Sequence, residues 1–293
     1  MSFVEDALKF HAEHNGMLAV ASKVPLNNRE DLALAYTPGV AEPCKAIKEN
    51  KELSFEYTCR GNTVAIVSDG TRVLGLGDIG PEAAMPVMEG KAVLFKTFGD
   101  VDAIPICIDT KDPEEIIETV RRLQPAFAGI NLEDFSSPKC YEIEDRLREI
   151  CDIPVFHDDQ HGTAIACLSA VMGALRYVKK DIKDVKVVVN GCGAAGSAIG
   201  RLFVSMGFPN VIMVERVGAL YKGIDAKLDK NQRYLSEVTN PNMEKGTLAD
   251  VAKGADILVG VSGPNLFTKE IIASMADKAI VFGLANPVPE TSY

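Results

Sequence analysis

The 293-residue sequence predicts an α/β protein of two domains, each built around a parallel β-sheet. From residue 64 onward, short runs rich in β-branched residues alternate with longer segments whose apolar residues recur every three or four positions. This alternation is typical of βαβ units, in which helices cover a parallel sheet. A charged stretch, KKDIKD, precedes the second group of strands. We therefore expect domains at 1–180 and 181–293.

The first domain is expected to contain strands separated by amphipathic helices. The predicted strands cover 64–67, 103–108, 127–132 and 154–156. The predicted helices cover 81–98, 112–124, 137–151 and 161–180. The second of these helices has a start signal, because Asp112 can cap its first turn and Pro113 fits its first position.

The second domain repeats the alternation around a glycine-rich turn. Its predicted strands cover 185–190, 211–215, 256–261 and 279–284, and a helix is expected over 194–208. The polar, turn-rich stretch 218–246 is interpreted as a surface excursion.

Composition restricts the partners and the compartment. With 31 Lys and Arg against 41 Asp and Glu, the net charge of −10 has the wrong sign for a phosphate-backbone binder, so we expect no nucleic-acid partner. The first residues lack the pattern of a signal peptide, and no apolar stretch approaches the length of about 18 residues that a membrane span requires. The 7 cysteines include no C-x-x-C pair. We expect a cytoplasmic protein with reduced thiols and no membrane segment.

The glycine-rich turn GCGAAG follows a buried-type strand and opens a helix. Gly191, Gly193 and Gly196 let the backbone approach a pyrophosphate, and the helix N-terminus offers free N–H groups. Glu215 closes the next strand, where a carboxylate can accept hydrogen bonds from a ribose 2′-hydroxyl and repel a 2′-phosphate. This position favours NAD over NADP, whereas Arg216 beside it favours the opposite choice. The alternative is a tight strand-to-helix turn without a ligand.

Acidic side chains follow two neighbouring predicted strands. Glu133 and Asp134 come directly after one of them, and Asp158 and Asp159 follow the next along the chain. The carboxyl ends of parallel strands are where open α/β sheets bind ligands, and crowded carboxylates suit a divalent cation. Mg²⁺ or Mn²⁺ is the expected metal. The alternative is a set of solvated loop acids and helix caps.

His157 and His161 have a spacing that can bind zinc on one helix face. No glutamate base lies between them, however, and their position after a strand does not fit a zinc-protease helix. We interpret both histidines as capping groups or as groups beside the metal ligands.

Three further residues are ambiguous from their surroundings alone. Lys91 lies on an apolar helix, where a buried ammonium could become a base, but a lysine that reaches solvent from the surface is favoured. Tyr36, before a Thr-Pro-Gly turn, is either a packed aromatic or an acid in a cleft. Arg72 stands in a glycine-rich loop, suited either to bidentate carboxylate binding or to a surface ion pair.

Six sequence blocks occur in the order and with the spacing of one family. They are LAYTPGVAEPC, VSDGTRVLGLGDIGPEAAMPVMEGKAVLFK, GINLEDFSSPKCYEIE, PVFHDDQHGTA, NGCGAAG and LANPVPE. The chain resembles the short microbial type of malic enzyme over nearly its whole length. This resemblance implies an N-terminal α/β domain for substrate and metal, followed by a Rossmann-like, doubly wound domain that binds the dinucleotide. It also implies oxidative decarboxylation of (S)-malate to pyruvate and CO₂ with NAD or NADP and a divalent metal.

The resemblance assigns roles to the residues that match the family's motifs. Tyr36 is the expected general acid and Lys91 the expected general base, with Asp158 orienting the lysine. Arg72 and Asn286 are expected to bind malate. The expected metal ligands are Glu133, Asp134 and Asp159. The expected cofactor-binding residues are Gly191, Gly193, Ala194, Ala195, Gly196, Glu215, Arg216 and Asn286.

The sequence departs from the family at three places. Cys192 replaces an alanine of the glycine-rich turn, and GIDAKLDKNQRYL differs from the family's G-R-x-D-L-N-P pattern. The chain ends after LANPVPE, where the family continues, so the second domain is expected to be incomplete. Two alternatives stay open: a malolactic-type or non-decarboxylating hydroxy-acid dehydrogenase, and a dinucleotide-binding protein without turnover. The resemblance also predicts a homodimer with its sites near the subunit interface.

Overall fold

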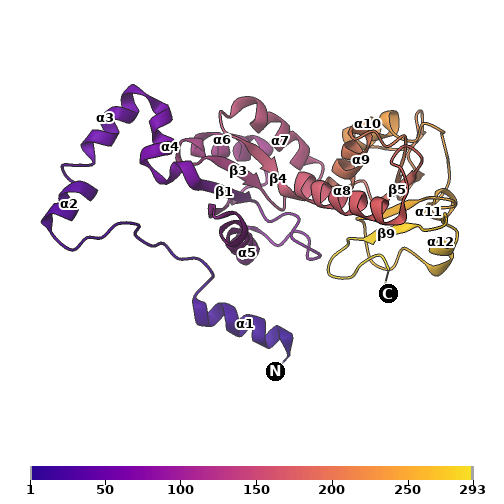
Figure 1. Ribbon diagram of the computed structural model, residues 1–293, viewed down its shortest axis with the longest axis horizontal. Helices are drawn as coiled ribbons and strands as arrows, with labels where there is room; N and C mark the ends of the chain where they lie inside the picture. Colours follow the sequence, from indigo (N-terminus) through magenta and orange to yellow (C-terminus); the bar gives the residue numbers. More distant parts are fainter. Residues whose placement is uncertain (1, 292–293) are drawn as a thin grey trace. The chain divides into compact units, whose positions relative to one another are not determined.

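The computed structural model describes residues 2–291, and the chain divides into two compact units (Figure 1). The first unit comprises the chain up to Val73 together with Asp78–Glu133 and Ile143–Phe156. The second comprises Leu74–Gly77, Asp134–Glu142 and the chain from His157 onward. Each unit is built around its own sheet, which confirms the predicted α/β class.

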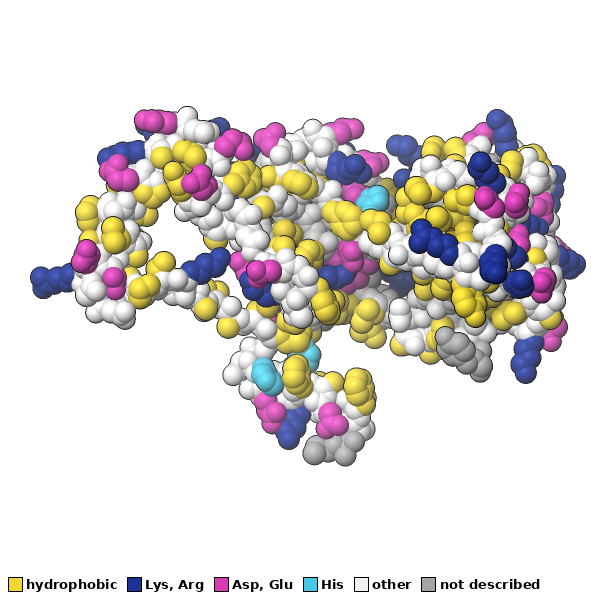
Figure 2. All heavy atoms as spheres, viewed as in Figure 1, with side chains coloured by type: hydrophobic (Ala, Val, Ile, Leu, Met, Phe, Trp, Pro, Cys, Tyr) yellow, Lys and Arg dark blue, Asp and Glu magenta, His cyan; other side chains and the backbone are white. Residues whose placement is uncertain are grey.

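The first unit begins with three helices that bury none of their residues. They are α1 (Phe3–His14), α2 (Arg29–Ala35) and α3 (Ala41–Glu49). Capping explains where α1 and α2 begin: Ser2 and Glu5 form a reciprocal capping box, and the Asn28 side chain accepts the Asp31 amide. Apolar side chains of these helices lie at the surface (Figure 2), among them Phe3, Leu8, Phe10, Leu32 and Leu34. These helices were not among the predicted elements.

The sheet of the first unit has the strand order β2-β1-β3-β4. Its strands are β1 (Thr63–Ser68), β2 (Asp102–Cys107), β3 (Gly129–Leu132) and β4 (Val155–His157). β1 pairs in parallel with β2 and with β3, so that Val64 lies opposite Ala103 and Gly129. The short helices η1 (Lys51–Leu53), α4 (Ser54–Tyr57) and η2 (Cys59–Asn62) precede β1. Each predicted strand of this domain is present, with small shifts at its ends.

Helices lie on both faces of this sheet (Figure 1). They are α5 (Pro81–Gly99), α6 (Pro113–Leu123), followed by η3 (Gln124–Ala126), and α7 (Lys139–Ile150). On one face α5 forms a small core with strand residues, made of Ile66, Met88, Ala92 and Ala103. The start of α6 agrees with the prediction, because the Asp112 side chain accepts the Glu114 amide and Pro113 begins the helix.

The sheet of the second unit has the order β7-β6-β5-β8-β9. Its strands are β5 (Lys186–Asn190), β6 (Asn210–Glu215), β7 (Gly218–Ala219), β8 (Ile257–Gly260) and β9 (Ile280–Gly283). The strands pair in parallel except for the short β6–β7 pair. One core contains residues of α8 (Asp158–Val178), α9 (Ala194–Ser205) and α10 (Lys230–Val238), and the other contains residues of α11 (Leu248–Val251) and α12 (Lys269–Ala273). Helices on both faces of a largely parallel sheet confirm the Rossmann-like, doubly wound fold.

Two parts of the second unit differ from the sequence prediction. The helix α8 was expected to end the first domain, but it packs against α9 and its buried face, including Ala164 and Val171, joins the core of the second sheet. The stretch 218–246 is more than a surface excursion, because it contains β7 and α10 and buries Leu220 and Leu235. Within residues 2–291, no helix combines the length and the apolar character needed to cross a membrane.

Candidate functional site

Lys91 forms an ion pair within the first unit. Its Nζ, carried by α5, lies 3.0 Å from Oε1 of Glu133, and the two side chains are 22% and 6% exposed. Glu133 extends the β3 ladder by donating its N–H to the Val67 carbonyl, and its Oε2 accepts Nδ2 of Asn131 at 2.8 Å. A carboxylate this buried needs such partners, because removing it from water is costly. Lys91 is therefore held at the site, and the interpretation of Lys91 as a solvent-reaching surface lysine is wrong.

Asp134 and Asp159 are joined by a hydrogen bond. The Asp134 N–H donates to Oδ2 of Asp159 at 2.8 Å, and Asp134 has a left-handed backbone with φ of 59°. Glu133 is the preceding residue in the chain, and one carboxylate oxygen from each of the three acids lies within 4.8 Å of the others. Carboxylates this close repel one another, and a hard divalent cation relieves that repulsion. The donor set therefore suits Mg²⁺ or Mn²⁺.

The first turn of α8 carries Asp158 and follows a buried histidine. A Cβ at Gly162 would lie 1.9 Å from Oδ1 of Asp158, so the glycine leaves room for this carboxylate. His157 is fully buried, with Nδ1 4.0 Å from Oδ2 of Asp159. It occupies the N-cap position of α8 but makes no side-chain capping bond, so the capping interpretation fails at His157. Among residues 2–291, the group of possible metal ligands consists of carboxylates.

The turn after β5 contains Gly191 and Gly193, and α9 begins directly after it. Gly191 has φ of 115°, and a Cβ on it would lie 2.9 Å from the Val261 carbonyl oxygen. A Cβ on Gly196 would lie 1.8 Å from the Gly191 carbonyl oxygen, so internal packing requires both glycines. In contrast, a Cβ on Gly193 would meet nothing within 4 Å. The turn is therefore open at Gly193, where a pyrophosphate could approach the helix N-terminus.

The replacement of alanine by Cys192 fits the glycine-rich turn. Its thiol is buried, and Sγ lies 3.6 Å from the Val214 carbonyl oxygen. Burial raises the pKa of Cys192 well above its usual range, so the thiol stays protonated. Ala194 and Ala195 follow as the first two residues of α9.

Glu215 ends β6, the strand next to β5, and therefore stands beside the glycine-rich turn. The Gly191 N–H donates to the carbonyl of Val214 at 2.9 Å, which joins the turn to the end of β6. Oε2 of Glu215 accepts the backbone N–H of Arg216 at 2.5 Å, and Arg216 is exposed. Both residues considered as selectors between NAD and NADP are thus located at this strand end.

Asn286 is exposed in the loop after β9, where its Nδ2 donates to the Leu284 carbonyl at 3.2 Å. A second segment approaches this loop within the second unit. A Cβ on Gly75 would lie 3.0 Å from Cδ of Pro287 and 3.3 Å from the Asn286 carbonyl oxygen. Arg72, which is exposed, stands three residues before Gly75 in the chain. Gly75 therefore packs against the loop that carries Asn286.

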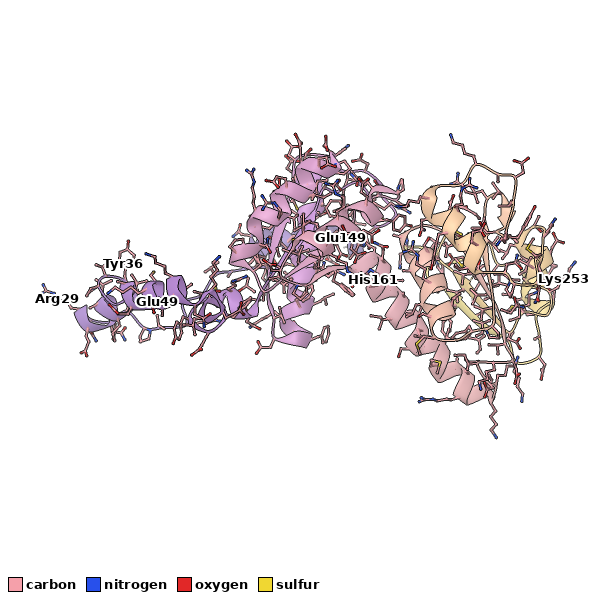
Figure 3. All side chains as sticks on the ribbon, turned by 90° about the horizontal axis from the view of Figure 1, so that it is seen from above. Arg29, Tyr36, Glu49, Glu149, His161 and Lys253 are labelled. Atoms are coloured by element: carbon pink, nitrogen blue, oxygen red, sulfur yellow. The ribbon has the colours of Figure 1, made fainter. Side chains whose placement is uncertain are left out.

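Tyr36 is not placed beside Lys91 within one copy of the chain. It follows α2 as its C-cap residue and is 67% exposed. Figure 3 shows Tyr36 among the N-terminal helices with Arg29 and Glu49, and Figure 1 shows α2 away from α5 in the same unit. The residues expected to act as general acid and general base are therefore apart in a single chain.

Two buried polar residues, Asn131 and Glu290, were not predicted from the sequence. Asn131 stands two residues before Glu133, and such spacing in a strand places both side chains on one face, so the sequence did contain this signal. Glu290 is fully buried and accepts the backbone N–H groups of Ser262 and Ala285. Its sequence context gave no sign of this burial.

The open position at Gly193 leads to a test of dinucleotide binding. Gly193→Ala should weaken NADH binding by about tenfold or more, because the added methyl group would occupy the space a pyrophosphate needs. Its backbone, with φ of −74°, accepts alanine, so the melting temperature should not fall. Fluorescence titration with NADH and thermal unfolding measure the two effects. Gly196→Ala is the matched control, which should destabilise the fold. Unchanged NADH affinity in Gly193→Ala would contradict the assignment.

The acid cluster predicts a loss of cation binding in Asp159→Asn. This change removes one negative charge but keeps an oxygen that can accept the Asp134 N–H. The affinity for Mn²⁺ should fall by about tenfold or more while the circular dichroism spectrum is unchanged. Asp181→Asn is the control, because Asp181 also accepts a backbone N–H, from Lys183, but lies outside the cluster. Equal Mn²⁺ affinity in the two variants would remove Asp159 from the ligand set.

Two known domain families together match most of the chain. The N-terminal domain of malic enzyme matches residues 15–148. The NAD-binding domain of malic enzyme matches residues 160–292. The short gap between the two matches contains β4. It also contains His157, where the last segment of the second unit begins.

Relatives with known names match over nearly the whole chain. The NAD-dependent malic enzyme of Geobacillus stearothermophilus is 53% identical over 275 residues, which are 94% of this chain but 57% of that relative. The bifunctional malic/malolactic enzyme of Bacillus subtilis strain 168 is 49% identical over 290 residues, 99% of this chain and 71% of the relative. The crystal structure of the NAD-dependent malic enzyme from Thermotoga maritima has a TM-score of 0.95 at 48% identity, covering 98% of this chain and 76% of that one. In sequence, fold and order of domains, the chain belongs to the malic enzyme family.

Proposed function

We propose that this chain carries the site for oxidative decarboxylation of (S)-malate to pyruvate and CO₂, with NAD and Mg²⁺ or Mn²⁺ bound. The observation that carries the proposal is the Lys91–Glu133 ion pair, which continues along the chain into the acid cluster of Glu133, Asp134 and Asp159. This arrangement places a lysine that can transfer a proton next to carboxylate oxygens that can bind a cation. Membership of the malic enzyme family and the names of the Geobacillus and Thermotoga relatives support the same reaction.

The three carboxylates would hold the cation, and Lys91 would move the first proton. When bound, the cation supplies Lewis-acid stabilisation of negative charge on the substrate, and NAD supplies the hydride acceptor. After its ammonium has released one proton to solvent, Nζ of Lys91 would accept the proton of the C2 hydroxyl as hydride leaves C2. Glu133 holds this Nζ at 3.0 Å, and we assign Asp158 to orienting the lysine.

Arg72 and Asn286 would bind malate. A guanidinium can hold a substrate carboxylate through two parallel hydrogen bonds, and the Asn286 amide can both donate and accept. Arg72 stands three residues before Gly75, which packs against the Asn286–Pro287 segment within the second unit. Fixing both ends of the substrate orients C2 and C3 for the successive proton transfers.

We assign the protonation of C3 to Tyr36 of a second copy of the chain. Within one copy, Tyr36 is exposed and α2 lies away from α5. The helices α1, α2 and α3 bury no residue within the chain and expose apolar side chains, as expected for a segment that packs against another subunit. A homodimer in which these N-terminal helices reach the partner would complete both sites.

NAD is the proposed dinucleotide. Glu215 stands at the end of the strand next to the glycine-rich turn, where a carboxylate would bond the ribose hydroxyls and repel a 2′-phosphate. Arg216 could instead pair with that phosphate, and its exposure leaves its side chain free to turn. The name of the family domain that matches residues 160–292 supports NAD.

One alternative is supported by the name of a relative. The Bacillus protein is named a bifunctional malic/malolactic enzyme, so conversion of malate to lactate is the second candidate activity. Formation of lactate without net NADH would identify it. The third possibility is a protein that binds NADH but does not convert malate. The same assay would then detect neither lactate nor NADH.

Lys91→Ala and Tyr36→Phe should affect different steps. Lys91→Ala should abolish malate oxidation, because it removes the proposed base for the C2 hydroxyl proton. Tyr36→Phe should spare the reduction of oxaloacetate but slow the tautomerisation of enolpyruvate by about 10²-fold or more. Separate assays of the partial reactions, each at saturating substrate, measure this difference. Equal losses in every partial reaction would contradict the separate roles.

Mixing these two inactive variants tests whether Tyr36 acts across a dimer. In a mixed dimer, one site would combine the intact Lys91 of one chain with the intact Tyr36 of the other. Random reassociation of equal amounts should restore about a quarter of the wild-type activity, since half of the dimers are mixed and each has one intact site. If both residues act within one chain, mixing restores no activity. The double variant Lys91→Ala/Tyr36→Phe mixed with either single variant is the control and should stay inactive.

Glu215→Ser should raise the affinity for NADP relative to NAD. It removes the repulsion of a 2′-phosphate and one charged hydrogen bond to the ribose, together about 1–3 kcal/mol. Inhibition or titration with the two reduced dinucleotides measures the ratio, and Arg216→Ala is the companion variant. A wild type that binds NADP more tightly, with the order reversed by Arg216→Ala, would show that Arg216 is the selector.

A further inference from the structure

We infer that Glu290 is a positioning residue of the dinucleotide site, because its buried carboxylate bonds to both loops that follow β8 and β9. The inference rests on the proposed NAD-dependent function. Glu290 is not one of the residues assigned to bind malate, metal or cofactor. It acts through the backbone of the two loops that contain Ser262 and Ala285.

The carboxylate of Glu290 accepts one backbone N–H at each oxygen. Oε1 accepts the N–H of Ser262 at 2.9 Å, and Oε2 accepts the N–H of Ala285 at 3.0 Å. The residue is 0% exposed, so these bonds are shielded from water. Only a carboxylate offers acceptors at both ends, whereas an amide of the same size offers one acceptor and one donor. Glu290 therefore fixes the spacing between the two loops.

The ends of both strands are shaped around this side chain. A Cβ on Gly260, the last residue of β8, would lie 2.4 Å from Cδ of Glu290. A Cβ on Gly283, the last residue of β9, would lie 3.3 Å from the Glu290 nitrogen and 3.4 Å from Oε2. The Phe267 N–H also donates to the Glu290 carbonyl at 2.9 Å. A side chain larger than glycine at Gly260 would displace the carboxylate.

Each loop leads directly to the proposed site. Oγ of Ser262 accepts Nδ2 of Asn190 at 2.8 Å, and Asn190 immediately precedes the first glycine of the glycine-rich turn. A Cβ on Gly191 would lie 3.0 Å from Cβ of Ser262, so the loop packs directly on the turn. In the second loop, Ala285 directly precedes Asn286 in the chain. In a doubly wound sheet the dinucleotide binds at the carboxyl ends of the strands, which are the ends that Glu290 joins.

Glu290→Gln should therefore weaken NADH binding. The amide group would face one of the two N–H groups with its own donor, and that buried N–H would lose its acceptor. We expect the dissociation constant for NADH to rise about tenfold. Where malate oxidation is measurable, the KM for NAD should rise by a similar factor, while a purely structural role would leave KM unchanged in the folded fraction.

Asp256→Asn provides the matched control at the opposite end of β8. The carboxylate of Asp256 also joins two segments, since it accepts Lys180 Nζ at 2.7 Å and the Lys186 N–H at 2.9 Å. Replacing this carboxylate with an amide should lower the melting temperature but leave the dissociation constant for NADH within about twofold of wild type. Comparing the two variants separates the positioning of the loops from general stability.

The experiment is a fluorescence titration of the full chain with NADH, without malate or metal, together with thermal unfolding of each variant. If Glu290→Gln does not fold, Glu290→Asp replaces it, because the shorter carboxylate cannot reach both N–H groups. Wild-type affinity in the folded Glu290 variant, or an equal loss in Asp256→Asn, would overturn the inference.

A wild type that binds NADH but does not oxidise malate would overturn the proposed function alone. A wild type that binds no NADH would overturn both.

Discussion

The burial of Glu133 is the constraint on which the proposed site depends. A carboxylate at the end of β3 that is almost removed from water must have partners, and it obtains them from Lys91 on α5 and Asn131 on the same strand. The ion pair joins α5 to the end of β3 and leaves the Lys91 side chain 22% exposed. The next residue, Asp134, bonds through its N–H to Asp159. One short segment therefore supplies both the ion pair and part of the acid cluster.

The second unit uses the same physical device for a different purpose. Glu290 is buried at the carboxyl ends of β8 and β9 and is satisfied by two backbone N–H groups instead of an ammonium. The ion pair leaves a titratable lysine beside the carboxylate, which suits proton transfer. The Glu290 carboxylate accepts two backbone N–H groups, which suits the rigid support of loops around the glycine-rich turn. Gly260 provides the space that the Glu290 carboxylate needs.

Much of this fold could be predicted from the sequence, because its signals are local. The β-branched strands, the Asp112 cap and the glycine-rich turn each act within a few residues. The packing partner of α8 could not be predicted, since an apolar face does not specify which sheet it covers. Lys91 was misjudged for a related reason: its neighbours in the helix give no information about Glu133, far along the chain. The exposure of the N-terminal helices and of Tyr36 had no local signal in the sequence, and the burial of Glu290 depends on two distant loops.

The most direct test of the account is the stoichiometry of products formed from (S)-malate by the purified chain with Mn²⁺ and NAD. NADH is followed by its absorbance, and pyruvate, lactate and CO₂ are determined in the same samples. The account predicts equal amounts of NADH, pyruvate and CO₂, no lactate, and loss of all three products when a chelator removes the cation. Lactate without net NADH, or no consumption of malate by a chain that binds NADH, would contradict it.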